Sequence, residues 1–314
     1  MRPERVDVVC LGILVADVLA RPVDEVPWGS LAFVEEIALR GGGCALNTAS
    51  ALVRLGVPAA AAGKVGVDAF GDFLLGLLDK RGVGREGVLR DGSVPTSASV
   101  ALVSGDGERT FLHLPGANAR VRPEELDPEV LFGGRWLHLA GALVLEELDG
   151  APTAAILAEA RRRGLRTSLD TVWDASGRWQ RLEPCLPHLD LIVPSMDEAR
   201  AITGEQEAAR VAAWFRKRGV AEVALTLGPA GCYAAGDGFE GLVATPRVHA
   251  VDGTGAGDAF AAGVINGRLA GWELERAVRF GNAAGALATT AVGAFEGVGG
   301  PAETLALAAQ AASL

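Results

Sequence analysis

The chain has 314 residues, of which 49% are hydrophobic and 22% charged, and its formal net charge is −10. This composition supports a well-buried globular core and excludes a largely disordered chain. Because the net charge is negative and the basic residues are scattered, neither a nucleic-acid-binding surface nor an anionic membrane partner is expected.

The cysteines give no sign of a zinc site or of a disulfide framework, because they lie far apart and form no C-x-x-C pair. A reducing cytoplasm is therefore the expected location, and no apolar run reaches transmembrane length. The four cysteines are Cys10, Cys44, Cys185 and Cys232.

Short β-rich runs alternate with stretches that carry apolar residues at helical spacing. This alternation predicts βαβ units, and hence a mostly parallel sheet flanked by helices. Strands are expected at residues 6–14, 136–140, 166–170, 189–193 and 222–227, and helices at 48–55, 70–81, 151–163 and 208–217.

Two segments, 21–39 and 97–114, break this alternation because each is extended and punctuated by turns, with no helix between its strands. They are predicted to form a small separate sheet. After residue 258 the chain is rich in alanine, and helices are expected at 258–269, 273–291 and 302–312.

We therefore expect one α/β domain over residues 1–314, a three-layer sandwich with a mostly parallel central sheet. A discontinuous β-sheet lid would come from about 17–40 and 95–115. Such a lid exposes an apolar face and an edge, so a homodimer that pairs two lids is also predicted.

Three glycines occur within five residues of the loop 252–258 (Asp-Gly-Thr-Gly-Ala-Gly-Asp), directly before a predicted helix. Glycines let consecutive amides turn toward one side, and a helix N-terminus adds unpaired N–H groups and a positive dipole end. The loop is typical of an anion-binding site. A carboxylate there, that of Asp258, would repel phosphate, so it is best interpreted as the base for an incoming hydroxyl.

A dinucleotide-binding fingerprint and a Walker loop are two other possible interpretations of glycine-rich loops in this chain. A dinucleotide fingerprint starting at Gly253 would need glycine in place of Asp258, and a Walker loop would need Ser or Thr where Val65 follows Gly63-Lys64. Neither fits. The structural alternative is a helix start with Asp258 as an acid in the first turn. A carboxylate at a helix N-terminus is expected to be a weak base. A weak base is sufficient, because phosphoryl transfer depends more on positioning and charge stabilisation than on early proton removal.

Residues 252–260 resemble the C-terminal signature of the ribokinase-like (PfkB-type) carbohydrate kinases. Residues 41–49 (Gly-Gly-Gly-Cys-Ala-Leu-Asn-Thr-Ala), with Leu55-Gly56, resemble the N-terminal signature of that family. Residues 63–71 (Gly-Lys-Val-Gly-Val-Asp-Ala-Phe-Gly) resemble the glycine and aspartate segment that follows it. The resemblance covers essentially the whole chain and implies a ribokinase-like fold.

The resemblance implies that Asp258 is the catalytic base, and that backbone amides form an anion hole for the transferred phosphoryl group. Those amides belong to Gly255, Ala256 and Gly257. Four residues are implied at the substrate: Asp17, Gly42, Gly43 and Asn47. The alternatives are a turn residue after the first strand for Asp17, and a helix N-cap for Asn47.

The resemblance also implies sites for ATP, Mg²⁺ and, in many relatives, K⁺. The implied nucleotide-binding residues are Thr226, Gly228, Gly231 and Asn282. The implied metal-site residues are Asp252 and Thr254 for K⁺ and Glu198 for Mg²⁺.

Two positions depart from the family pattern. Ser195 stands where relatives have the asparagine of an Asn-x-x-Glu pair, so the network around Mg²⁺ is expected to be altered. Asp174 stands where several sugar and sugar-acid kinases have the arginine of Asp-x-Asn-x-Arg, which disfavours an anionic substrate at that point.

The leading hypothesis is an ATP-dependent kinase for a small neutral sugar or polyol. A nucleoside kinase of the same family is the alternative, with Trp28, Phe33, Phe111 or Trp173 to stack on the base. A sugar-phosphate kinase ranks third. A catalytically silent ligand-binding relative would have lost Asp258 or the anion-hole glycines, and both are present.

Overall fold

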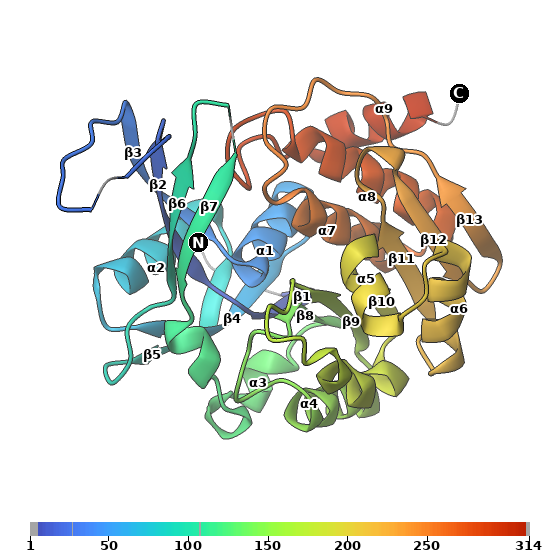
Figure 1. Ribbon diagram of the computed structural model, residues 1–314. Coiled ribbons are helices and arrows are strands. Elements are labelled where there is room, and N and C mark those ends of the chain that lie inside the picture. The colour runs from blue at the N-terminus through green and yellow to red at the C-terminus, as the bar shows by residue number, and fades with distance from the viewer. Residues whose placement is uncertain (1–5, 27, 107, 312–314) are drawn as a thin grey trace.

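The computed structural model describes residues 6–26, 28–106 and 108–311 (Figure 1). Its centre is a nine-stranded sheet in the order β13-β12-β11-β10-β9-β8-β1-β4-β5. Only β12 and β13 run antiparallel to their neighbours, so the mostly parallel sheet is confirmed. The strands are β1 (Val8–Gly12), β4 (Ala59–Gly66), β5 (Gly84–Asp91), β8 (Trp136–Ala142), β9 (Arg166–Thr171), β10 (Leu191–Val193), β11 (Glu222–Thr226), β12 (Cys232–Gly236) and β13 (Phe239–Val243).

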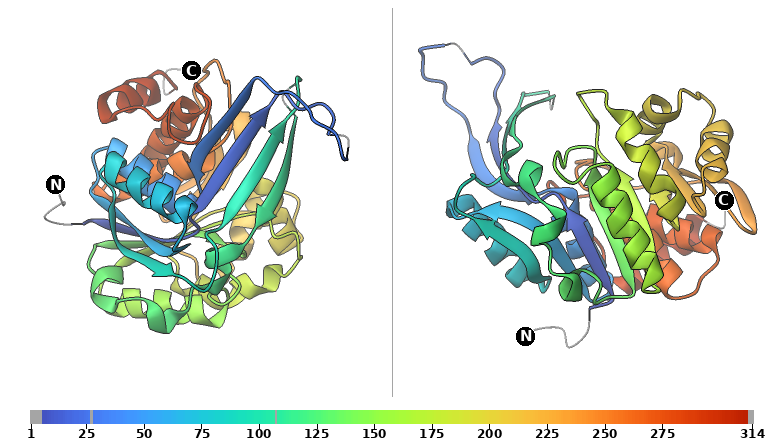
Figure 2. Two further views of the ribbon diagram at one scale, coloured as in Figure 1. Left: turned by 90° about the vertical axis from the view of Figure 1, so that its left-hand side faces the viewer. Right: turned by 90° about the horizontal axis from the view of Figure 1, so that it is seen from below.

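Helices cover both faces of this sheet, which gives the predicted three layers (Figure 2). In β1, Val8 and Cys10 pack into one apolar core with α1, α2, α7 and α8, while Val9 and Leu11 pack into the other with α4, α5 and α6. Strands buried on both faces appear as continuous apolar runs, as they do here. The helices are α1 (Cys44–Arg54), α2 (Ala69–Arg81), α3 (Pro128–Leu131), α4 (Ala151–Arg162), α5 (Met196–Thr203), α6 (Ala208–Lys217), α7 (Ala256–Leu269), α8 (Leu274–Ala288) and α9 (Pro301–Ala311).

A four-stranded sheet, the lid, stands apart from these layers (Figures 1 and 2). Its order is β3-β2-β6-β7, and the parallel pairing of β2 with β6 joins the two segments that were expected to form it. Its strands are β2 (Val15–Arg21), β3 (Glu36–Gly42), β6 (Ala98–Val103) and β7 (Arg109–Leu114).

The two faces of the lid differ in character. Across its strands, Leu39, Val18, Val100 and Leu112 lie in one row, and Arg40, Asp17, Ser99 and His113 lie in the next. Because successive residues of a strand point to opposite faces, the first row belongs to an apolar face and the second to a polar one. The apolar face includes exposed side chains, those of Ile37, Leu39, Val100, Leu112 and Leu114.

The first strand is shorter than predicted because Asn118 forms hydrogen bonds with the backbone of Leu14. The buried amide of Asn118 accepts a hydrogen bond from Leu14 N (3.1 Å) and donates one to Leu14 O (3.0 Å). These two bonds occupy the backbone groups that would have extended the strand. The chain then enters the lid at Val15, two residues before the expected start.

Helix ends also differ from the expected ones. The first helix begins at Cys44, four residues early, with Gly43 as its N-cap. The helix expected to reach residue 291 ends at Ala288, where the Thr289 carbonyl accepts hydrogen bonds from Val251 N and Asp252 N instead. Residue 312 of the last predicted helix lies outside the described residues.

Lys64 in β4 is a buried cation rather than a phosphate ligand. Its side chain is 2% exposed, and its Nζ donates to both carboxylate oxygens of Glu125 (2.8 and 2.6 Å) and to Arg120 O (2.6 Å). A buried ammonium needs such partners because desolvating it alone is costly. None of the helices in the described part of the chain has the length and apolarity needed to cross a bilayer.

Candidate active site

Several residues of the candidate site lie where the parallel strands end. Asp170 lies in β9 one residue before its end, Thr226 ends β11, and the N-terminus of α7 faces the same edge of the sheet. The carboxyl ends of parallel strands are the usual place for ligands in open α/β sheets. The lid adjoins this edge through β2, which follows β1 after two residues.

The anion loop, residues 252–257, has the glycine geometry that its sequence predicts. Gly255 is the N-cap of α7 with φ +76°, and a Cβ there would lie 2.5 Å from Ala294 O, so only glycine fits. A Cβ at Gly257 would meet nothing within 4 Å. The first amides of a helix have no intrahelical acceptor, so the start of α7 can cradle a phosphoryl group.

Asp252 holds this loop in shape. Its Oδ1 accepts hydrogen bonds from Thr254 N (2.9 Å) and Thr254 Oγ1 (2.7 Å), and its Oδ2 accepts one from Gly293 N (2.9 Å). The carboxylate is buried and ties the loop to the segment that follows α8. Asp252 and Thr254 thus form the first part of the anion loop, and their role as K⁺ ligands stays a prediction.

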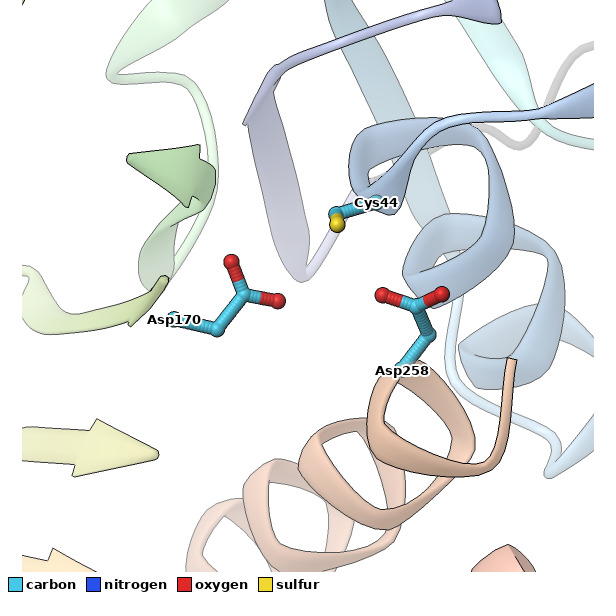
Figure 3. A group of neighbouring side chains, drawn as sticks. All are labelled: Cys44, Asp170 and Asp258. Carbon is cyan, nitrogen blue, oxygen red and sulfur yellow. The ribbon is translucent and has the colours of Figure 1, made fainter. Parts of the chain in front are cut away.

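Asp258 faces two other side chains across a small gap (Figure 3). One atom each of Cys44, Asp170 and Asp258 lies within 4.8 Å of the others. These residues come from α1, β9 and α7, so three separate elements meet at this point. Asn47, one turn along α1, donates from Nδ2 to Asp258 Oδ2 (2.9 Å).

Burial and the nearby charge of Asp170 raise the pKa of Asp258 from 3.8 to about 7, against the opposing hydrogen bond from Asn47. A helix N-terminus would lower this pKa, but it is worth only about 0.3–1 kcal/mol, less than the 1.36 kcal/mol of one pKa unit. The expectation of a weak base is therefore wrong. The desolvated, crowded carboxylate is a better proton acceptor than its helix position alone predicts.

Asp170 is itself held in place by a buried network. The Gly141 amide donates to its Oδ1, and His138 Nε2 lies 3.6 Å from its Oδ2. On the other side of the imidazole, His138 Nδ1 lies 2.8 Å from Ser168 Oγ, which also accepts from Trp136 Nε1 (2.7 Å). The position of Asp170 is therefore determined by the central strands.

The substrate-side residues form a continuous row from the lid to Asp258. Asp17 lies inside β2, on the polar face of the lid, so its interpretation as a turn residue is wrong. A Cβ on Gly42 would lie 2.0 Å from Asp17 Oδ2, and one on Gly43 would lie 2.4 Å from Ile13 O. Gly42 thus leaves room for the Asp17 carboxylate, and Gly43 lets the start of α1 lie against the backbone at Ile13.

Burial raises the pKa of Asp17 to about 6, although a hydrogen bond from Ser99 lowers it. Asn47 lies inside α1, whose N-cap is Gly43, so the capping interpretation of Asn47 is wrong as well. Its Oδ1 is buried and has no hydrogen-bond partner among the described residues. Such an orphan acceptor is costly unless a ligand donates to it, and a sugar hydroxyl could do so.

Of the residues expected at the nucleotide, Thr226, Gly228 and Gly231 lie between the end of β11 and the start of β12, and Asn282 lies in α8. Thr226 forms an isolated bridge with Ser195, and a Cβ on Gly231 would lie 2.2 Å from Val243 O. Gly228 has φ +58° and starts a single helical turn. Asn282 is buried and donates to Val243 O (2.8 Å), so its amide holds the end of β13 against α8.

Ser195 and Glu198 form a capping box at the start of α5. Ser195 Oγ accepts from Glu198 N (3.3 Å), and Glu198 Oε2 accepts from Ser195 N (2.9 Å) and Thr171 Oγ1 (2.9 Å). Burial raises the pKa of Glu198. Its Oε1 accepts no hydrogen bond from the described residues and can face a metal-bound water.

Asp174 folds into its own turn. Its carboxylate accepts from Ser176 N (2.8 Å), Ser176 Oγ (2.5 Å) and Arg178 N (2.5 Å). Arg178 in turn pairs with Glu146 (2.6 Å). This segment therefore offers no unpaired guanidinium to an anionic acceptor.

Sequence reasoning missed Asp170 and Cys44 as parts of the site. Residue 170 appeared only as the end of an expected strand and the start of a motif from which the chain departs, and Cys44 appeared in the signature segment 41–49 without a role. The end of a buried parallel strand was a usable signal for Asp170. For Cys44 there was no such signal, since its place beside Asp258 depends on the early start of α1. Burial and the two carboxylates raise its pKa, so it is a neutral thiol.

Comparison with known proteins gives a consistent result. The chain matches the model of the pfkB family carbohydrate kinases over residues 5–298. It is 30% identical over 272 residues to probable fructokinase-2 of Arabidopsis thaliana, a match that covers 81% of this chain and 82% of that protein. It is 31% identical over 284 residues to 2-dehydro-3-deoxygluconokinase of Bacillus subtilis, covering 86% of this chain and 87% of that protein.

Among solved structures, the fold is similar to that of fructokinase from Vibrio cholerae O395 in a form with bound fructose, ADP and calcium ion. The TM-score is 0.80 at 25% sequence identity, and the match covers 97% of this chain and 99% of the other. With the family signatures, the strand order and the lid in agreement, the chain belongs to the pfkB family of carbohydrate kinases.

Proposed function

We propose that this enzyme transfers the γ-phosphoryl group of ATP to a hydroxyl group of a small neutral sugar or polyol, with Asp258 as the base. One observation carries the proposal: a carboxylate with raised pKa lies in the first turn of a helix whose glycine-lined start can hold a phosphoryl group. Base and anion hole are then adjacent, as in-line transfer requires.

The residues of the site would have different roles in the transfer. The amides of Gly255, Ala256 and Gly257 would stabilise the charge of the transferring group, and Thr226, Gly228, Gly231 and Asn282 would shape the nucleotide end. Bound Mg²⁺ would neutralise phosphate charge, with Glu198 as the protein group that orients it through water. Asp258 would align the acceptor hydroxyl and take its proton.

A neutral acceptor fits the other end best. Asp17 and the orphan Oδ1 of Asn47 are hydrogen-bond acceptors, which suit hydroxyl donors and repel carboxylates or phosphates. The one cation of the turn that begins at Asp174, Arg178, is paired with Glu146, whereas a sugar-acid substrate would need an unpaired one. Phe111 lies on the polar face of the lid with Asp17 and can pack on the apolar side of a sugar ring.

The acceptor is identified by an ATP-consumption screen of hexoses, pentoses, polyols, nucleosides and sugar acids at matched ionic strength. We expect turnover with one or more neutral sugars, fructose among the first to test. A preference for nucleosides or sugar acids would overturn the proposed class.

We further propose a single kinase domain with a discontinuous lid, working in the cytoplasm, where the four unpaired cysteines stay reduced.

Asp258→Asn is expected to lower kcat by about 10²–10⁴-fold while the fold and ATP binding are retained, because the amide cannot accept the proton. Asparagine keeps the shape of the side chain, so a purely structural acid would show little effect. Steady-state kinetics of the folded variant distinguish the catalytic role from the structural one. The control is Asp237→Asn, at an exposed aspartate. Turnover within about tenfold of wild type would remove Asp258 as the base.

Asp17→Ala is expected to raise KM for the sugar, and to lower kcat/KM about 10- to 150-fold, because a hydrogen bond to a charged group is worth roughly 1.5–3 kcal/mol. Since the pKa of Asp17 is about 6, the wild-type KM should also rise as pH falls through this value and the carboxylate becomes protonated. Unchanged KM in the variant, at neutral pH, would rule out the hydroxyl-binding role.

We also propose a K⁺ site at Asp252 and Thr254, next to the anion hole, where a bound cation would hold the loop amides in position. Activity in K⁺ buffer is expected to exceed that in Na⁺ buffer, because Na⁺ is smaller than K⁺ and would fit the proposed K⁺ site less well. Asp252→Asn should abolish the difference. Equal rates in both salts for the wild-type enzyme would contradict the cation site and leave the kinase assignment intact.

We propose that two lids pair through their apolar faces in a homodimer. Leu112 is 62% exposed on this face, so Leu112→Asp should convert dimers to monomers in sedimentation velocity at micromolar concentration. Leu242→Asp, at a leucine 61% exposed on β13, is the matched control and should leave the dimer intact. A wild-type protein that sediments as a monomer would disprove the dimer.

A further inference from the structure

A cavity lies between the last turns of α1 and α2 and residues 295–296. Its volume is about 500 Å³. Its basic lining residues are Arg54, Lys80 and Arg81, its apolar ones Val53, Leu77 and Phe295, and its acidic one Glu296. None of these residues belongs to the catalytic site, and we call it the α1–α2 cavity.

The three basic residues of this cavity form no close ion pair, although Glu296 lies near enough to Arg81 to interact with it electrostatically. Elsewhere most arginines have one, such as Arg85 with Asp79 (2.6 Å) and Arg90 with Asp72 (2.6 Å) on the neighbouring surface of α2. Among the residues that the structure describes, neither Arg54, Lys80 nor Arg81 has a carboxylate oxygen within 4.0 Å.

The two guanidinium groups are nevertheless fixed in position. Arg54 Nε donates to Val298 O (3.2 Å), and Arg81 Nη1 donates to Ser50 Oγ (3.2 Å) while its guanidinium stacks 4.1 Å above the Phe295 ring. These contacts use one of the five N–H donors of each arginine. The remaining donors, with the Lys80 ammonium, are available to an anion.

The electrostatics of the cavity oppose those of the whole chain. Three cations against one carboxylate surround it, whereas the chain carries a net charge of −10. The C-terminal dipoles of α1 and α2 offset part of this positive charge. Dipole compensation accounts for basic residues in each last turn, but it requires neither a shared cavity nor an apolar wall.

We propose that the α1–α2 cavity binds a small phosphate monoester and that this binding activates the kinase. Arginine recognises phosphate through paired N–H donors, and Lys80 adds a point charge. The volume lies within the range of small-molecule sites, and Val53, Leu77 and Phe295 suit a short carbon skeleton.

The cavity is connected to the catalytic loop through a few residues. Phe295, which stacks with Arg81, directly follows Ala294, which contacts Gly255, and Gly293 donates to Asp252 Oδ2 (2.9 Å). An anion that holds Arg81 and the Phe295 segment in place therefore also restrains the residues that support the anion loop. Activation would follow from better-ordered loop amides.

Binding is tested with the full-length protein and glycerol 3-phosphate as the probe, by isothermal titration calorimetry at constant ionic strength and with saturating Mg-ATP and no sugar. The variants are Lys80→Glu and, as the matched control, Lys217→Glu, an exposed lysine on α6 with the same change of charge. We expect binding to wild type and to Lys217→Glu, and at least tenfold weaker binding to Lys80→Glu. Arg54→Gln serves as a second variant and should weaken binding in the same direction.

Turnover is then measured for the same proteins with and without the probe. Activation of wild type and Lys217→Glu, absent in Lys80→Glu, supports the proposal. Equal affinities of the two lysine variants, or a probe that ATP displaces completely, would overturn the site. Binding without a change in turnover would overturn the activation. Because calorimetry needs no sugar, failure of the binding site and failure of the proposed function remain distinguishable.

Discussion

The proximity of two carboxylates, those of Asp258 and Asp170, is the constraint on which the rest of the site depends. Burial and the charge of Asp170 both disfavour the ionised form of Asp258. The fold holds the two carboxylates together because each accepts a hydrogen bond from a fixed donor, Asn47 Nδ2 for Asp258 and the Gly141 amide for Asp170. The result is a carboxylate whose pKa rises to about 7, in the range where a general base works best.

This arrangement explains why the surrounding elements are built as they are. β9 pairs with β8 and β10 inside the parallel sheet, which positions the backbone of Asp170 near Asp258. The start of α7 is fixed by Gly255 against Ala294 and by Asp252 against Gly293. α1 supplies Asn47, and the two glycines before it let the lid bring Asp17 close. Rigid elements thus place Asp258, the proposed base, while the lid places Asp17, the group that we propose to bind substrate.

Much of this could be predicted from the sequence, and the failures have physical causes. The alternation of strands and helices predicted the three layers, and the glycine spacing at 252–258 predicted an anion-binding loop, because both are local patterns. Asn118 was beyond such patterns, since it ends β1 through two hydrogen bonds to a residue 104 positions away. The raised pKa of Asp258 was also missed, because it depends on burial and on Asp170, and both arise only in the folded sheet.

The central claim is that Asp170 makes Asp258 an effective base, and the pH dependence of kcat at saturating sugar tests it most directly. Saturation removes the titration of Asp17, which acts on KM. In the wild-type enzyme, kcat should rise with pH through an apparent pKa near 7. In Asp170→Asn, which keeps an oxygen to accept from Gly141, this limb should shift to lower pH because a negative charge is removed. An unshifted limb in the folded variant, or a wild-type kcat that does not change between about pH 5 and 8, would contradict the account.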